Sequence, residues 1–408
     1  MSFNYDPFVI YLKLIVLLYA DDTVIFGTDE KCFQENLDHF YDFAESWKLD
    51  INFSKTKVMT FGTRNDEHRE FKLGNEIIEI CKEFKYLGVT FSKTRSFYKT
   101  MKNNVTQAKK AMHLLYKRIR NLNLPIDLQL KLFDHTIVPI LLNGCEVWGY
   151  QNTQIIENVQ NDLLRKMLNL RKSTPIYILL AEFGRRPLQI NIKCRMINYW
   201  ISVVNGKPSK LSKVLYTILL NEKNIGRYEH NWIRCINNIL ISVGKIDLLK
   251  SDKIDNPHAL KASIKRTLTD LYIQEWHGKL NDSSKGKTYS LFKHDISLES
   301  YLVDLPRKHY IHLCKFRTAN HRLPVETGRW ENVPIHERLC NICNDDIGDE
   351  FHYLFKCKSF DNERKLYLKP YSYNRPNIPK FVDLMSSQNT IVLTKLSKFV
   401  RIIMERIA

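Results

Sequence analysis

The spacing of the apolar residues changes once along the chain, near Ser92, and the change separates two parts with different expected folds. Before it, short apolar runs of strand length, which are typical of β-structure, recur at residues 15–26, 49–53, 58–61 and 84–91. Apolar and aromatic residues at helical spacing occupy 35–47 among these runs. Strands, a helix and further strands predict an α+β unit over residues 1–95.

After Ser92 the apolar residues step by three and four positions, which predicts amphipathic helices without intervening strands. The first helix is defined by Val105, Ala108, Met112, Leu115, Ile119 and Leu122. Further helices are expected between Pro125 and Pro139, over 155–168, through most of 190–300, and at 389–407.

Charge and composition restrict the partners of the chain. Its 408 residues contain 62 Lys and Arg against 44 Asp and Glu, a net charge of +18, with 44% hydrophobic residues. That hydrophobic content excludes global disorder, and a cationic surplus of this size favours a polyanion such as RNA, DNA or their hybrid. The apolar run 8–20 contains Lys13 and is too short to span a membrane. Nine cysteines without a disulfide pattern indicate an intracellular compartment, nuclear or cytoplasmic.

Asp21 and Asp22 are adjacent carboxylates at the tip of the hairpin expected over 15–26. Two negative charges this close repel each other unless solvent or a cation relieves them. A solvated acidic turn is one interpretation. The other is a site for Mg²⁺, which takes carboxylate oxygens and the phosphates of a substrate.

Cys340, Cys343, His352 and Cys357 have the spacing Cys-x₂-Cys-x₈-His-x₄-Cys. Three thiolates and one imidazole complete a tetrahedral zinc site and leave no open position, so we expect a structural CCHC zinc knuckle. Chance spacing of reduced cysteines is the alternative. A second metal cluster of His309, His312 and His321 near Cys314 is not favoured, and surface or partly buried histidines are expected there.

Three ordered blocks resemble the non-LTR, LINE-type family of retroelement reverse transcriptases. Residues 19–22, Tyr-Ala-Asp-Asp, are similar to the catalytic palm hairpin of that family. Residues 47–57 resemble the next palm motif, and 84–89 resemble the primer-contacting hairpin. Similar blocks continue at 146–149, 180–188 and 317–330, so the resemblance extends from about residue 15 over nearly the whole chain.

The resemblance implies roles for individual residues. Asp21 would be a magnesium ligand with Asp22 in the same catalytic site, and Lys55 and Lys57 are candidates for a cation near the leaving pyrophosphate. Lys85 and Tyr86 would contact the primer, whereas Leu87 and Val89 would be core residues. The alternative interpretation of Lys55 is a solvated lysine at a strand edge.

Cationic residues form two groups. Lys109, Lys110, Lys117, Arg118 and Arg120 share one face of the helix after the primer-contacting block, either as a solvated face or as a thumb that follows a duplex backbone. In 305–338, interleaved with Tyr310, Phe316 and Trp330, we expect nucleic-acid contacts from Arg317, Arg322 and Arg329.

The expected fold class is an α+β amino-terminal partial polymerase palm, a mainly α-helical thumb and linker, and a small zinc-binding module. The expected divisions are 1–95 palm, 96–175 thumb, 176–304 linker, 305–370 basic segment and zinc knuckle, and 371–408 connector and terminal helix.

The expected function is that of a truncated RNA-directed DNA polymerase. The family places another metal-binding Asp and the fingers upstream of the hairpin, where only about 18 residues precede Tyr19. We therefore expect no useful polymerisation from this chain alone. A non-catalytic, zinc-dependent nucleic-acid-binding remnant and a decayed element without a selected role are the alternatives.

Overall fold

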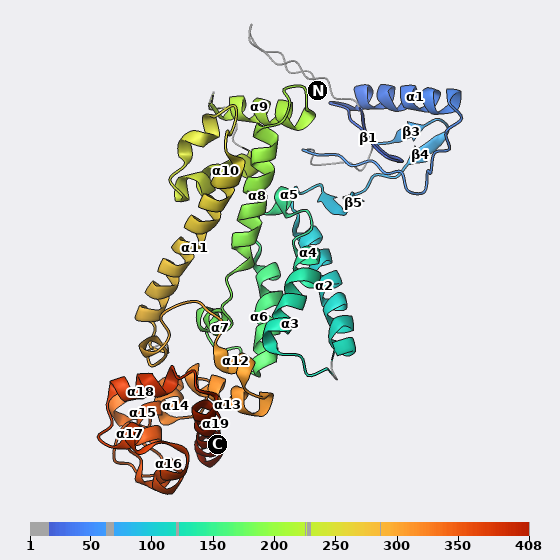
Figure 1. Ribbon diagram of the computed structural model, residues 1–408. Helices are drawn as coiled ribbons and strands as arrows, with labels where there is room; N and C mark the ends of the chain where they lie inside the picture. Colours follow the sequence, from blue (N-terminus) through green and yellow to red (C-terminus); the bar gives the residue numbers. More distant parts are fainter. Residues whose placement is uncertain are drawn as a thin grey trace. The chain divides into compact units, whose positions relative to one another are not determined.

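A computed structural model describes residues 16–62, 69–119, 122–224, 226, 230–285 and 287–407 (Figure 1). The chain divides into two compact units. Unit 1 consists of Met1–Asn103 and Gly206–Arg234, and unit 2 consists of Asn104–Asn205 and Cys235–Ala408. The palm, thumb, linker and zinc-binding divisions expected from the sequence are functional assignments that these two units do not test, so the divisions stay a prediction.

In its described part, unit 1 combines two-stranded antiparallel hairpins, drawn blue to cyan in Figure 1, with helices. Its elements are β1 (Val16–Tyr19), β2 (Asp22–Ile25), α1 (Glu30–Ser46), β3 (Phe71–Leu73), β4 (Glu76–Ile78), β5 (Glu83–Tyr86), β6 (Val89–Ser92), the first residues of α2 (Tyr98–Ile119), α9 (Leu211–Asn224) and the first residues of α10 (Asn231–Ser242).

A small apolar core joins α1 to the hairpins of unit 1. Leu37 on α1 is buried with Val58, Phe71, Leu73 and Ile78, and Ile25 packs against this cluster. Because Ile25 lies on β2, the core contact holds one face of the β1–β2 hairpin against the rest of unit 1.

The hairpin expected over 15–26 and the helix over 35–47 are confirmed. The single strand-like run expected over 84–91 is instead the hairpin β5–β6, which agrees with the hairpin that the resemblance implied at 84–89. The strand expected over 49–53 is wrong, because Asn52 Oδ1 accepts hydrogen bonds from Ser54 Oγ (2.7 Å) and the Lys55 amide (3.2 Å), which form a turn. The strand expected over 58–61 is reduced to one parallel bridge between Val58 and Ile80.

Unit 2 is helical throughout its described part, apart from isolated bridges. Its elements after α2 are α3 (Ile126–Leu132), η1 (Phe133–Ile137), α4 (Val138–Leu141), α5 (Cys145–Trp148), α6 (Gln154–Leu168), α7 (Ile176–Glu182), α8 (Leu188–Val204), the rest of α10, η2 (Ile246–Lys250), α11 (Pro257–Asp282), η3 (Tyr289–Leu291), α12 (Ser300–Asp304), α13 (Arg307–Arg317), α14 (Pro324–Trp330), η4 (Ile335–Glu337), α15 (Glu350–Phe355), η5 (Lys358–Phe360), α16 (Asp361–Tyr367), α17 (Pro370–Tyr373), α18 (Ile378–Met385) and α19 (Thr390–Ile407).

The expected helices of unit 2 are confirmed at α2, α6 and α19. Between Pro125 and Pro139 the helix is interrupted by the π-helical turn η1. The core consists mainly of aliphatic residues and contains three fully buried tryptophans, Trp148, Trp200 and Trp276, each of which removes extensive apolar surface from water.

A buried charge cluster, defined by Glu182, Lys293, Glu299 and Arg317, joins three distant segments of unit 2. Arg317 Nε lies 3.0 Å from Glu182 Oε1, and Arg317 Nη2 lies 2.9 Å from Glu299 Oε2. Lys293 forms an ion pair with Glu299. Burial raises the pKa of the Glu182 carboxyl, and the Arg317 charge opposes that shift. The two cations and two anions balance, so none of these buried charges is uncompensated.

Gly184 allows the segments that carry this cluster to approach each other. The residue has a φ of +61°, and a Cβ atom at this position would meet the Leu298 amide nitrogen at 2.4 Å. Phe183 bridges Leu298, and the Glu299 amide donates to the Glu182 carbonyl at 3.1 Å. The close backbone contact thus places both carboxylates beside the Arg317 guanidinium.

Removing the Arg317 charge tests the importance of the cluster. We expect Arg317→Met to lower the free energy of unfolding by about 3–5 kcal/mol, because Glu182 and Glu299 lose a buried cationic partner. The unfolding midpoint in urea, followed by circular dichroism, measures the effect.

The matched control is Arg401→Met. Arg401 pairs with Glu405 at 2.7 Å on the exposed side of α19, where an ion pair contributes at most about 0.5 kcal/mol. Equal midpoints for the two variants would contradict a dominant role of the cluster.

Candidate acidic hairpin and metal centre

The two acidic residues of the β1–β2 hairpin differ in backbone position, one in the turn and one on a strand. Tyr19 pairs with Asp22, so Ala20 and Asp21 form the two-residue turn and Asp22 begins β2. Ala20 has a φ of 52°, a left-handed conformation that costs an L-residue about 1–2 kcal/mol. Both carboxylates are exposed, and neither has an ion-pair partner among residues 16–62, 69–119 and the other described ranges.

Strand alternation directs Asp22 away from the core of unit 1. Successive side chains of a strand point to opposite faces, and Ile25 packs against the core. Asp22 therefore belongs to the opposite face, together with its cross-strand partner Tyr19. The hairpin can offer carboxylate oxygens to a ligand on its solvent side.

Lys55 is exposed on the turn around Asn52. In the described part of unit 1 no ion pair joins it to Asp21 or Asp22. Lys57, by contrast, pairs with Glu79 at 2.6 Å. Lys55 thus remains available to an anion.

The β5–β6 hairpin carries Lys85 and Tyr86, with Lys85 exposed and Tyr86 half-buried. Tyr86 pairs with Val89, and Leu87 and Gly88 form the turn with φ values of 47° and 82°. Two positive φ values are typical of a type I′ turn. The expectation that Leu87 is a core residue is wrong, because its place at the turn tip leaves it exposed.

The cationic face expected on α2 is present in the described residues. Lys109, Lys110, Lys117 and Arg118 are exposed, while Ala108 on the same helix is fully buried. Arg120 lies outside the described residues. The side chains of these four cations are therefore accessible to a polyanion in solution.

The three arginines expected to contact nucleic acid in 305–338 differ in environment. The expectation that Arg317 contacts nucleic acid is wrong. Its side chain is 2% exposed and is bound within the charge cluster, so it stabilises the fold and cannot reach a nucleic acid. Arg322 is exposed. Arg329 is half-buried and pairs with Glu326 at 2.7 Å.

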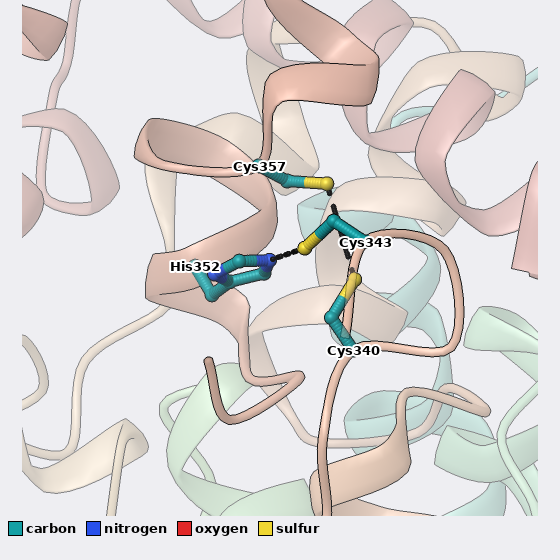
Figure 2. Close-up of side chains that lie close together, drawn as sticks. All are labelled: Cys340, Cys343, His352 and Cys357. Atoms are coloured by element: carbon teal, nitrogen blue, oxygen red, sulfur yellow. Dashed lines mark hydrogen bonds between the residues drawn. The ribbon is translucent and has the colours of Figure 1, made fainter. Parts of the chain in front are cut away.

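The four residues of the expected zinc knuckle converge in unit 2 (Figure 2). Their ligand atoms all lie within 4.8 Å of one another. Cys340 Sγ and Cys357 Sγ are 3.9 Å apart, and Cys343 Sγ lies 3.2 Å from His352 Nε2. Zinc–sulfur bonds of about 2.3 Å give tetrahedral edges of about 3.8 Å. The four donors therefore surround a space that fits zinc.

Local backbone structure places these ligands. The Cys340 amide donates to the Asp346 carbonyl at 2.9 Å, which closes the loop that carries Cys340 and Cys343. Asp349 caps α15 by accepting from the His352 amide at 2.7 Å, and the Cys357 amide donates to the His352 carbonyl at 2.9 Å. The loop thereby presents Cys340 and Cys343, while α15 presents His352 and the turn after it presents Cys357.

The environment of the donors suits a metal. Burial raises the pKa of the Cys340 thiol, but hydrogen bonds from Tyr353 and from the Cys343 and Ile342 amides outweigh it, and the resulting pKa lies below the ordinary value. His352 Nδ1 is buried without a hydrogen-bond partner in the described structure. With Nε2 directed toward Cys343, the imidazole is oriented as a ligand.

Arg364 holds the backbone around the Cys340, Cys343, His352 and Cys357 cluster, and the sequence did not predict this role. Its Nε donates to the Leu354 carbonyl at 2.8 Å, and its Nη2 donates to the Cys357 carbonyl at 2.7 Å. Tyr353 stacks edge-on against Phe360 at 6.0 Å. A lone arginine seven positions after a ligand has no recognisable spacing, so only the structure reveals this support.

The histidines near Cys314 form no metal group among the described residues. His309 Nδ1 lies 3.2 Å from Ser397 Oγ, and His312 is half-buried. His321 is buried, contrary to expectation, because its Nε2 donates to Glu350 Oε1 at 2.9 Å.

Residues 3–91 match the family "Reverse transcriptase (RNA-dependent DNA polymerase)". The match contains the acidic hairpin, the Lys55 turn and most of the β5–β6 hairpin, and it begins before residue 15. With the relatives described next, it confirms the resemblance of the chain to LINE-type, non-LTR reverse transcriptases.

The similar curated proteins are polymerases of mobile elements. The RNA-directed DNA polymerase from mobile element jockey of Drosophila melanogaster is 26% identical over 50% of this chain and 23% of its own length. The jockey protein of Drosophila funebris is 24% identical over 41% of this chain and 19% of its own length. The probable RNA-directed DNA polymerase from transposon BS of Drosophila melanogaster is 25% identical over 36% of this chain and 18% of its own length. The chain thus spans about a fifth of the length of these relatives.

None of the helices that the structure describes is both long enough and apolar enough to cross a bilayer.

Zinc content tests the metal centre. We expect about one equivalent of zinc in the reduced protein and close to none in Cys357→Ser, because a tetrahedral site that loses one thiolate no longer encloses the ion. Inductively coupled plasma mass spectrometry after gel filtration measures it. Cys32→Ser, in unit 1, is the matched control and should retain zinc. Zinc well below one equivalent in the reduced, unsubstituted protein would exclude the site.

Proposed function

We propose that the chain belongs to the RNA-directed DNA synthesis machinery of a LINE-type retroelement. The observation that carries this proposal is the pair of exposed carboxylates on a β-hairpin inside the segment that matches the reverse transcriptase family. A solvated acidic turn would explain the carboxylates alone, but it would not explain the family match around them.

In this proposal the hairpin residues bind and orient the reacting groups. Asp21 and Asp22 would hold magnesium, which would stabilise the charge on a transferred phosphoryl group. Lys55, exposed and without an acidic partner among the described residues, neutralises the departing pyrophosphate. Lys85 and Tyr86 contact the primer strand from the β5–β6 hairpin.

We also propose that the polypeptide of these 408 residues does not polymerise DNA at a useful rate by itself. The only group of three or more potential ligands in the described residues is the Cys340 cluster. Asp21 and Asp22 thus have no described third carboxylate, and two metal ions need further ligands to remain in position.

Primer extension tests this statement. We expect the 408-residue polypeptide, with a primed RNA template, deoxynucleotides and magnesium, to give incorporation no greater than its Asp21→Asn variant. Robust incorporation that is lost in Asp21→Asn but retained in Asp38→Asn would contradict it, since Asp38 lies on an exposed part of α1. In that case Asp21 would be shown to act in catalysis.

The cationic face of α2 is proposed to follow a nucleic-acid backbone, as a polymerase thumb does. Its support is the exposure of Lys109, Lys110, Lys117 and Arg118 on one helix. Each cation that neutralises a phosphate releases a counterion, so binding should weaken steeply with salt.

Replacing these four cations with Gln should reduce the slope of log K against log[KCl] by about 3–4 on an RNA–DNA duplex. Fluorescence anisotropy over a KCl series measures the slope. The matched control replaces four exposed lysines of α10–α19, Lys250, Lys365, Lys395 and Lys398, and should retain most of it. An affinity that hardly depends on salt would reject the electrostatic explanation.

A second candidate function, a zinc-dependent nucleic-acid-binding remnant without catalysis, is favoured by one observation. The metal centre and the exposed Arg322 lie in unit 2, separate in sequence from the acidic hairpin. The coding DNA upstream of Met1 distinguishes the candidates, since an in-frame continuation that encodes a further palm carboxylate favours the polymerase. None of the nine cysteines forms a disulfide bond, and this cysteine usage supports an intracellular site, nuclear or cytoplasmic.

A further inference from the structure

A cationic pocket of about 300 Å³ lies in unit 2, outside the acidic hairpin and the metal centre. It is formed by the loop after α6, the turn between α13 and α14, and the end of α19. Arg171, Lys315 and Arg322 line it together with Asn169 and Asn320, and Met404 adds an apolar wall. No Asp or Glu is among its lining residues.

The three cations of this pocket are uncompensated. In the described part of unit 2, no carboxylate forms an ion pair with Arg171, Lys315 or Arg322. Burial lowers the pKa of Lys315, and the nearby Arg171 charge lowers it further. Like charges held together in a concavity favour an anion, whose binding would relieve their repulsion.

Buried hydrogen bonds hold the pocket in shape. Asn320 donates to Thr174 Oγ1, which joins the α13–α14 turn to the loop after α6. The same loop accepts a hydrogen bond at Ser173 O from Lys285 Nζ at 3.1 Å. His321 is fixed by Glu350 at 2.9 Å. These hydrogen bonds fix the backbone that carries the cations. Little conformational entropy of the protein should therefore be lost when a ligand binds.

An aromatic surface adjoins the cations. Arg171 lies over the Trp330 ring, with its guanidinium carbon 5.4 Å from the ring centroid. Trp330 is 44% exposed, although large aromatic residues of unit 2 such as Trp148 and Trp200 are buried. An exposed tryptophan beside cations is typical of sites that stack a nucleobase next to a bound phosphate.

We propose that this pocket binds a phosphate of single-stranded nucleic acid through Arg171, Lys315 and Arg322, while Trp330 stacks on an adjacent base. The choice of a nucleic acid as the ligand rests on the proposed function; the anion preference rests on the pocket alone. Lys315 and Arg322 lie in the basic segment 305–338, whereas Arg171 belongs to no motif in the sequence, and the fold brings it to them from a segment that is distant in the chain.

Anisotropy titrations of the full 408-residue protein with a short fluorescein-labelled oligo(dT) test the pocket. We expect the combined variant Arg171→Gln, Lys315→Gln and Arg322→Gln to weaken binding by roughly tenfold or more and to lower the salt slope by about 2. The matched control is Lys365→Gln, Lys395→Gln and Lys398→Gln, which removes three exposed charges of unit 2 outside the pocket. Zinc content and circular dichroism establish that both variants fold.

Trp330 supplies an independent readout. Oligo(dT) should quench tryptophan fluorescence in the unsubstituted protein, and Trp330→Phe should abolish that quenching while binding is retained, because Phe still stacks. Trp330→Ala should lose both quenching and affinity.

The outcomes separate the pocket from the proposed function. If the unsubstituted protein binds oligo(dT) and the pocket variant binds as tightly as its control, the pocket proposal is wrong and the proposed function stands. If the unsubstituted protein binds neither oligo(dT) nor an RNA–DNA duplex, both fail. Preferential loss of affinity in the pocket variant supports the pocket, whatever the primer-extension result.

Discussion

The buried pairing of Arg317 with Glu182 and Glu299 is the interaction on which the architecture of unit 2 most depends. Charged groups removed from water without partners are costly, so the segments that carry them must come together as a set. Lys293 adds the balancing charge, and Arg317 also donates to the Met385 carbonyl at the end of α18. One guanidinium thus connects α7, α13, α18 and the segment before α12.

The position of α13 has consequences for both other features of unit 2. The helix ends at Arg317, and the turn that follows it provides Asn320, His321 and Arg322 to the cationic pocket. Glu350, which holds His321, begins α15, and His352 of the Cys340 cluster lies in the same helical turn. The charge cluster, the pocket and the metal centre are therefore consecutive parts of one packed arrangement.

The sequence predicted features that depend on near neighbours. The Tyr19–Asp22 hairpin and the four metal ligands follow from short spacings, and the structure contains both arrangements. The strand expected over 49–53 fails because the side chain of Asn52 competes with strand pairing. Arg317 was assigned to nucleic acid because its charge pattern is the same whether its partner is a phosphate or a carboxylate 135 residues away. Long-range burial cannot be read from such a pattern. For the same reason the sequence did not predict that Arg171 joins Lys315 and Arg322 in one pocket.

The interleaved order of the two units along the chain limits how the protein can be dissected. The backbone passes from unit 1 to unit 2 after Asn103, returns for Gly206–Arg234, and enters unit 2 again at Cys235. A fragment that ends at Asn103 would lose α9 as well as all of unit 2, and a single cut between Asn205 and Gly206 would divide both units. Neither unit corresponds to one contiguous gene fragment, so their roles are better separated by point substitutions than by truncation.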